Sequence, residues 1–333
     1  MISPCYGATS PPLTGVWITR QQNDPLPERV VEQVLLGVST RGYAQSLEPL
    51  PEGIKARGTS KSAASRHLVE QTKAKLQDKL RGRLDGVEPI ALMIDGIEIA
   101  GHVVVVALGI TLDGRKVPLG IALGSTENAA VCTTLLQDMI ERGLVVQSRI
   151  LCVIDGGKGI RKALNDVLGS MVIVQRCQLH KIRNVLSHLP KKRQPHIRRA
   201  MRGAYKSSTV VTARRLLKNL ANSLERDGEE DAAASLREGM EETLTVIKLG
   251  LPETLRRSLS TTNAIENIMG TVRRVSRNVK NWRNGAMAKR WVSLGVTAAE
   301  RRFRRIKGHR FLSQLRQVLR KAEKQLDADR EAA

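Results

Sequence analysis

Two hexapeptides predict the centre of the fold: IALMID at residues 90–95 and ILCVID at residues 150–155. Each is an apolar run that ends in an aspartate, which is typical of a buried strand in a parallel sheet. Neighbouring strands of one sheet lie about 4.8 Å apart. If the two strands are neighbours, Asp95 and Asp155 leave them at matching positions, close enough to hold a divalent metal ion between them.

The residues around these hexapeptides predict a mixed sheet. The pair Asp113-Gly114 is typical of a hairpin turn between two antiparallel strands. Right-handed crossovers then allow the first strand to lie beside the strand that ends in Asp155. The expected elements are strands at 88–95, 102–111 and 116–123, a helix at 128–143, a strand at 149–155, a helix at 158–169 and a strand at 170–176.

The charge of the chain indicates a polyanionic partner. There are 55 Lys and Arg against 32 Asp and Glu, which gives a net charge of +23. Residues 176–222 hold thirteen basic and no acidic side chains, and residues 271–307 hold twelve basic side chains against Glu300 alone. Blocks of this size favour nucleic acid as the partner. The candidates for contact with DNA in these blocks are Lys191, Lys192, Arg193, Arg273 and Arg274.

Membrane and secretory classes fit less well. No apolar stretch approaches the roughly 20 residues of a spanning helix, and the N-terminus lacks a signal-peptide pattern. The four cysteines form no CxxC pair and no framework of close spacings. We therefore expect no membrane partner and a cytoplasmic, nucleoid-associated location.

Glu266 is the candidate for a third acid. The pattern Asn263-x-x-Glu266 is also that of a capping box, in which the acid only satisfies backbone donors. In the functional alternative, the helix at 262–276 packs its apolar face, which includes Ile265 and Val272, on the sheet and directs Glu266 toward the two aspartates. The spacing leaves both alternatives open.

The Cys-x-x-His pair formed by Cys177 and His180 could be half of a zinc site. No second pair at a suitable spacing follows it, so a packed cysteine and a polar histidine near the active cleft are favoured over zinc. Trp282 and Trp291 lie in the second basic block. Each could belong to the core, which is the commoner role, or stack on unpaired bases.

Four ordered motifs resemble those of the bacterial Mutator-type insertion-sequence transposases, a DDE group with a ribonuclease-H-like core. They are MIDGIEIAGHVVVVALGITLDGRKVPLGIALGSTEN at 93–128, VIDGGKGIRKAL at 153–164, RCQLHKIRNV at 176–185 and STTNAIENIMGTVRR at 260–274. The resemblance implies that Asp95, Asp155 and Glu266 are the three catalytic acids. Cys177 and His180 match the C-x-x-H signature of the family.

The N-terminal region departs from this family. Only 94 residues precede Asp95, fewer than members usually carry, so we expect part of an N-terminal DNA-binding region to be missing. The remaining helical pattern resembles a helix-turn-helix, with a second helix capped by Thr59 or Ser60. Lys61 and Arg66 lie in the first two turns of that helix and are candidates for reading DNA.

The expected fold is α/β: a ribonuclease-H-like mixed sheet with an all-helical insertion, preceded by a helix-turn-helix-like region. The expected parts are a loop or disordered start at 1–27, a helical DNA-binding region at 28–86, the first part of the core at 87–175, a basic helical insertion at 176–260, and core completion with the third acid and basic C-terminal helices at 261–333.

The resemblance implies a DNA transposase of a mobile element. Its three acids would hold two Mg²⁺ ions, which Mn²⁺ can replace, and it would cleave the element ends and join them to target DNA. Its partners would be terminal inverted repeats and target DNA, bound by a homo-oligomer. Two alternatives are a DNA-binding regulator or inactive remnant, and a ribonuclease-H-like nuclease without strand transfer.

Overall fold

The computed structural model describes residues 26–46, 60–99, 101–124 and 128–331. The chain divides into two compact units, Met1–Ala74 and Lys75–Ala333. Within the described residues, no helix is both long and apolar enough to cross a membrane.

The first unit holds helix α2 (Leu26–Leu35), the short 3-10 helix η1 (Ala44–Ser46) and the first part of α3 (Lys61–Arg81). Ser60 Oγ accepts a hydrogen bond from Ala63 N at 3.1 Å, so Ser60 caps α3 as predicted. Ala64 and Leu68 on α3 are buried, as their spacing predicts. Between α2 and α3, the short helix η1 is the helical segment among the described residues, and residues 47–59 lie outside them.

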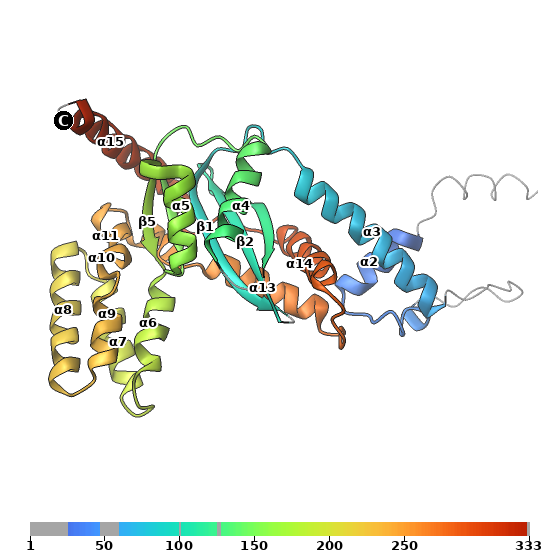
Figure 1. Cartoon of the computed structure of the whole chain (residues 1–333), viewed down its shortest axis with the longest axis horizontal. Helices are drawn as coiled ribbons and strands as arrows, with labels where there is room; N and C mark the ends of the chain where they lie inside the picture. Colours follow the sequence, from blue (N-terminus) through green and yellow to red (C-terminus); the bar gives the residue numbers. More distant parts are fainter. Residues whose placement is uncertain (1–25, 47–59, 100, 125–127, 332–333) are drawn as a thin grey trace, which may run out of the picture. The chain divides into compact units, whose positions relative to one another are not determined.

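The second unit is built on a five-stranded mixed sheet in the order β3-β2-β1-β4-β5 (Figure 1). β1 pairs with β2 antiparallel and with β4 parallel, and Ile94 lies opposite Ile154. The expected neighbourhood of the two hexapeptides is therefore confirmed. The strands are β1 (Pro89–Ile99), β2 (His102–Thr111), β3 (Lys116–Gly124), β4 (Ile150–Ile154) and β5 (Val172–Arg176).

Two details of the sheet bear on the sequence prediction. β1 continues to Ile99 instead of ending at Asp95, because its antiparallel pairing with β2 extends beyond the end of β4. The predicted hairpin between β2 and β3 is present: Thr111 N donates to Arg115 O at 3.0 Å, and Gly114 has a φ of +82°. A left-handed backbone of this kind favours glycine.

Helices cover both faces of the sheet, and the alternation of side chains along β1 decides which face each residue joins. Leu92 and Ile94 pack with α4 (Ala129–Glu141) and α5 (Lys158–Leu168). Ala91 and Met93 pack with residues from α12, α13, α14 and α15. Asp95 continues the Ala91–Met93 alternation and so belongs to the face that α13 covers. The helices on that face are α12 (Glu253–Leu259), α13 (Asn263–Ser276), α14 (Gly285–Glu300) and α15 (Leu312–Glu331).

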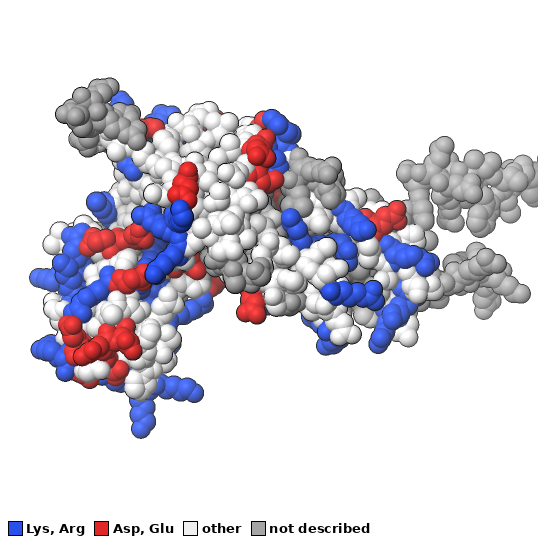
Figure 2. Space-filling model, viewed as in Figure 1, with Lys and Arg blue, Asp and Glu red and all other residues white. Residues whose placement is uncertain are grey.

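Residues 177–261 between β5 and α13 are helical and have a hydrophobic core of their own. Figure 2 shows that basic and acidic side chains intermingle over α8 and α9. The ion pairs Arg214–Glu241 and Arg237–Glu225, at 2.6 Å each, belong to this pattern. The helices are α6 (Gln178–Ser187), α7 (Gln194–Tyr205), α8 (Val210–Arg226), α9 (Glu230–Arg237), α10 (Met240–Thr243), α11 (Thr245–Lys248) and α12.

A buried polar cluster attaches these helices to the sheet. Lys181 Nζ, fully buried, donates to Ser235 O and Glu238 O at 2.6 Å each and to Glu238 Oε2 at 2.9 Å. Arg176 Nη1 lies 2.8 Å from Glu238 Oε1. The hydrogen bond from Arg176 and the contacts with Lys181 lower the pKa of Glu238 to about 2. The end of β5 and the start of α6 are thus fixed to the turn after α9.

Candidate active site

The strands place two aspartates side by side. Asp95 lies within β1 and is only 3% exposed, and Asp155 directly follows β4. Asp155 Oδ1 accepts a hydrogen bond from Gly157 N at 2.7 Å, which orders the turn into α5. Gly156 has a φ of +104°, and a Cβ there would clash with Arg176 Nε, so the turn requires glycine.

Helix α13 brings Glu266 to the same edge of the sheet. Its buried Ile265 and Val272 pack in one cluster with Ala91 and Met93, as the functional alternative predicted. The N-cap of α13 is Thr262, whose side chain makes no capping hydrogen bond. Glu266 Oε1 instead accepts a hydrogen bond from Arg183 Nη1 at 2.6 Å. In this structure Glu266 therefore belongs to an ion pair and not to a capping box.

The three acids are electrostatically coupled through Asp95. Burial raises the pKa of Asp95 to about 6, and the negative charges of Asp155 and Glu266 add to that rise. His180 and Thr262 oppose it without cancelling it. Asp95 is thus a buried carboxyl group whose negative charge is only partly compensated by the protein.

Cys177 and His180 connect the start of α6 to the start of α13. Cys177 Sγ accepts from Thr262 N at 3.5 Å and from Thr262 Oγ1 at 3.6 Å. Interaction with the Cys177 side chain, supported by the charges of Asp95 and Asp155, raises the pKa of His180 to about 9. Burial alone would raise the pKa of the Cys177 thiol, but His180 outweighs it and the net pKa is lowered. His180 Nε2 lies 3.9 Å from Glu266 Oε1, so this pair borders the acids.

The three carboxylates are the type of ligand that a hard divalent cation prefers. Carboxylate oxygens are the ligands that Mg²⁺ prefers, and a cation would relieve the repulsion that acts on buried Asp95. Within the described part of the chain, however, no group of three or more His, Cys, Asp and Glu side chains lies close enough to hold one metal ion. Glu266 is engaged by Arg183 instead.

The other predicted site residues lie on separate elements. Lys61 and Arg66 are exposed in the first two turns of α3, and Arg273 and Arg274 are exposed near the end of α13. Lys191 and Lys192 are exposed in the turn before α7.

Arg193, by contrast, forms ion pairs with Asp227 and, at 3.1 Å, with Glu229. Trp282 is partly buried against the main core, which favours its core alternative.

Sequence reasoning missed Arg183 and Thr262. Arg183 lies three positions after His180 on α6, so one helical face presents both to Glu266. That spacing is the only signal in the sequence that could have found it. Thr262 is fully buried beside Cys177 and carries no signal of its own.

The chain belongs to the Mutator family of transposases: residues 12–305 match the family described as "Transposase, Mutator family". The predicted resemblance is therefore confirmed. The chain is 28% identical over 282 residues, 82% of this chain and 70% of the relative, to the transposase for insertion sequence element IS256 in transposon Tn4001 of Staphylococcus aureus. It is 28% identical over 249 residues, 72% of this chain and 73% of the relative, to the transposase for insertion sequence element IS6120 of Mycolicibacterium smegmatis.

Proposed function

We propose that this protein is an insertion-sequence transposase that cleaves DNA at the ends of its element and joins those ends to target DNA. Family membership supports the activity, and its relatives are named as transposases of insertion sequences. The observation that carries the assignment of the site is the parallel pairing of β1 with β4, which sets Asp95 and Asp155 next to each other on adjacent strands.

In this proposal Asp95, Asp155 and Glu266 are the three catalytic acids of a DDE site. The order of three antiparallel strands followed by two parallel ones, with helices on both faces, supports a ribonuclease-H-like core. The coupling of Asp95 to both other acids supports their acting together. Residues 176–260 would be the family's helical insertion, and Lys61 and Arg66 on α3 would read the DNA sequence.

The residues that would hold Mg²⁺ or Mn²⁺ are the same three acids. When bound, two such ions supply activation of water and stabilisation of the leaving 3′ oxygen in phosphodiester cleavage. The contribution of the chain is to keep Asp95 buried and Asp155 fixed by its turn. Arg183 forms an ion pair with Glu266 in this structure, and Glu266 would leave that pair to bind the cation. Cleaving and pairing two terminal inverted repeats requires at least two copies of the protein on DNA.

The test is a cleavage assay on duplexes that carry the sequences flanking the coding region. Asp95→Asn, Asp155→Asn and Glu266→Gln should each reduce Mg²⁺-dependent cleavage by about a thousandfold or more, because metal-held charge stabilisation contributes several kcal/mol. Binding to the same duplex should persist. The matched control is Glu98→Gln, on the same strand as Asp95 but exposed.

Three outcomes would contradict parts of the proposal. Cleavage at the wild-type rate by Glu266→Gln would remove Glu266 from the triad. Cleavage without joining of the freed 3′ ends to a target plasmid would indicate a nuclease. Binding to duplex DNA with no cleavage in either metal would indicate a regulator or an inactive remnant.

A further inference from the structure

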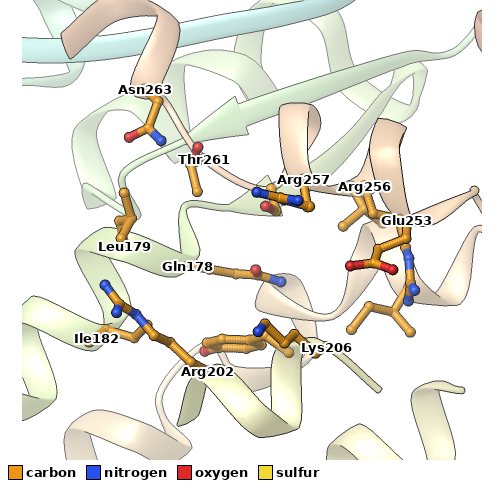
Figure 3. A pocket seen from close by; sticks show the side chains of 14 residues that line it. Gln178, Leu179, Ile182, Arg202, Lys206, Glu253, Arg256, Arg257, Thr261 and Asn263 are labelled. Carbon is orange, nitrogen blue, oxygen red and sulfur yellow. The ribbon is translucent and has the colours of Figure 1, made fainter. Parts of the chain in front are cut away.

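A cavity of about 400 Å³ lies between α6, α7, α11 and α12 (Figure 3). It has no part in the chemistry assigned to the three acids. Its position, charge and lining together indicate a ligand.

The cavity adjoins the candidate active site, because residues of the same two segments contribute to both. Along α6 and its N-cap, the cavity residues Gln178, Leu179 and Ile182 alternate with the site residues Cys177, His180 and Arg183. At the start of α13, Thr261 and Asn263 line the cavity on either side of Thr262. The two segments are joined by the hydrogen bond from Gln178 N to Ser260 O at 2.9 Å. A molecule in the cavity therefore contacts the elements that carry the site.

The cavity is positively charged. Four basic residues line it, Arg202, Lys206, Arg256 and Arg257, against the single acid Glu253. Figure 3 shows Arg202 and Lys206 on the wall opposite Arg256 and Arg257. Within the described residues, no ion pair involves any of these four side chains. Arg256 Nη1 donates to Ser207 O at 2.8 Å, but its Nε is buried with no hydrogen-bond partner in the described part of the chain.

The rest of the lining is apolar. Leu179, Ile182, Val246 and Ile247 contribute aliphatic surface, and Tyr205 contributes an aromatic ring. Burial raises the pKa of Tyr205 to about 12, so its phenol is uncharged at neutral pH. An apolar, partly aromatic wall beside several cations is complementary to a molecule with a flat base and an anionic group.

The groove continues from the cavity toward Arg183. A second hollow shares Leu179, Ile182 and Arg202 with the first and adds Arg183 and Arg198. Arg198 and Arg202 on α7 and Lys206 at its C-cap follow one another at four-residue intervals, so they form one basic row along the helix. Two residues of this row, Arg198 and Arg202, line the same hollow as Arg183, which pairs with Glu266.

We propose that this cavity binds a single unpaired nucleotide of the DNA strand that the candidate active site engages. The base would lie against Tyr205 and the aliphatic wall, and the phosphate would lie between Arg202 and Arg257. A duplex is too wide for a cavity of this size, whereas one nucleotide drawn out of the stack fits. The proposal deepens the proposed function and rests on it.

The experiment compares two labelled hairpin duplexes that differ only in one unpaired thymidine, bound by the full chain at fixed salt. The wild-type protein should bind the hairpin with the unpaired thymidine about tenfold more tightly, since stacking and phosphate contacts on one base contribute that much. Arg202→Ala combined with Arg257→Ala should remove this preference. The matched control, Arg199→Ala with Arg215→Ala, removes the same charge from exposed positions outside the cavity and should keep the preference.

A second readout does not depend on the arginine variants. A 5-iodouracil in place of the unpaired thymidine should crosslink on irradiation to the peptide that contains Tyr205. Crosslinking confined to other peptides would overturn the proposal, as would equal affinity of the wild-type protein for both hairpins. Displacement of the hairpin by free thymidine monophosphate at micromolar concentration would assign the cavity to a free nucleotide instead.

The outcomes also separate this proposal from the one on which it rests. A protein that binds and cleaves duplex DNA through Asp95, yet shows no preference for the unpaired thymidine, retains the proposed function and loses only this inference. A protein that binds neither hairpin loses both.

Discussion

Helix α6 borders two clusters of charged side chains: in one the charges are paired within the chain, and in the other negative charge is left over. On one side, buried Lys181 donates hydrogen bonds to three oxygens, and the Glu238 carboxylate forms ion pairs with both Lys181 and Arg176. On the other side, buried Asp95 is repelled by Asp155 and Glu266, and His180 compensates it only in part. A cluster whose charges are satisfied within the chain stabilises the fold, whereas one left with surplus charge has capacity for a ligand.

The largest effect on stability should come from the satisfied cluster. Lys181→Met leaves the backbone oxygens of Ser235 and Glu238 without their donor. At about 2 kcal/mol for each unsatisfied acceptor, the free energy of unfolding should fall by about 4 kcal/mol. The measurement is urea denaturation at pH 7. Lys192→Met is the matched control, because Lys192 is exposed, and it should change the value by less than about 0.5 kcal/mol. Equal changes in the free energy of unfolding for the two variants would contradict the stabilising role of the satisfied cluster.

The unsatisfied cluster should respond in the opposite direction. Asp95 has its pKa raised from 3.8 to about 6 by burial, so its stabilising contribution is complete below about pH 4 and is lost as the pH rises through 6. Asp95→Asn cannot ionise, so the variant does not lose this stability as the pH rises. Measured with a chelator present, the variant should match the wild-type protein near pH 4 and be more stable by about 3 kcal/mol at pH 8. A variant less stable than the wild-type protein at pH 8 would show that the Asp95 charge is well compensated.

The sheet and the pairing of the two aspartates were predictable because they depend on local patterns. Apolar runs that end in Asp95 and Asp155 fix the strands, and Asp113-Gly114 fixes the hairpin. The partner of Glu266 was not predicted, because Arg183 lies 83 positions away in the sequence and only the fold brings the two side chains together. Lys181 was missed for a related reason: a lysine in a basic block indicates an exposed side chain, and its acceptors lie more than 50 positions further along.

The same contrast divides the three basic residues predicted to contact DNA before α7. Arg193 is paired with Asp227 and Glu229, whereas Lys191 and Lys192 are exposed and have no ion pair among the described residues. Lys191→Ala with Lys192→Ala should lower the slope of log affinity for duplex DNA against log salt by about 1.8, or about 0.9 for each lost phosphate contact. Arg193→Ala should leave the slope nearly unchanged. A slope that responds to Arg193 alone would reverse this assignment.

The smallest effect on stability should come from the ion pair between Arg183 and Glu266, which borders the unsatisfied cluster. Their side chains are 57% and 32% exposed, so Arg183→Ala should lower the free energy of unfolding by less than about 1 kcal/mol. The effect of Arg183→Ala on metal binding should be more informative.

Arg183 holds Glu266 and adds positive charge beside the three acids, so its removal should tighten Mn²⁺ binding by the DNA-free protein, measured by titration calorimetry. Arg199→Ala, on an exposed face of α7, is the control for loss of charge alone. Weaker Mn²⁺ binding by Arg183→Ala would mean that Arg183 positions Glu266 for the ion and does not compete with it, which would place this arginine with the satisfied cluster.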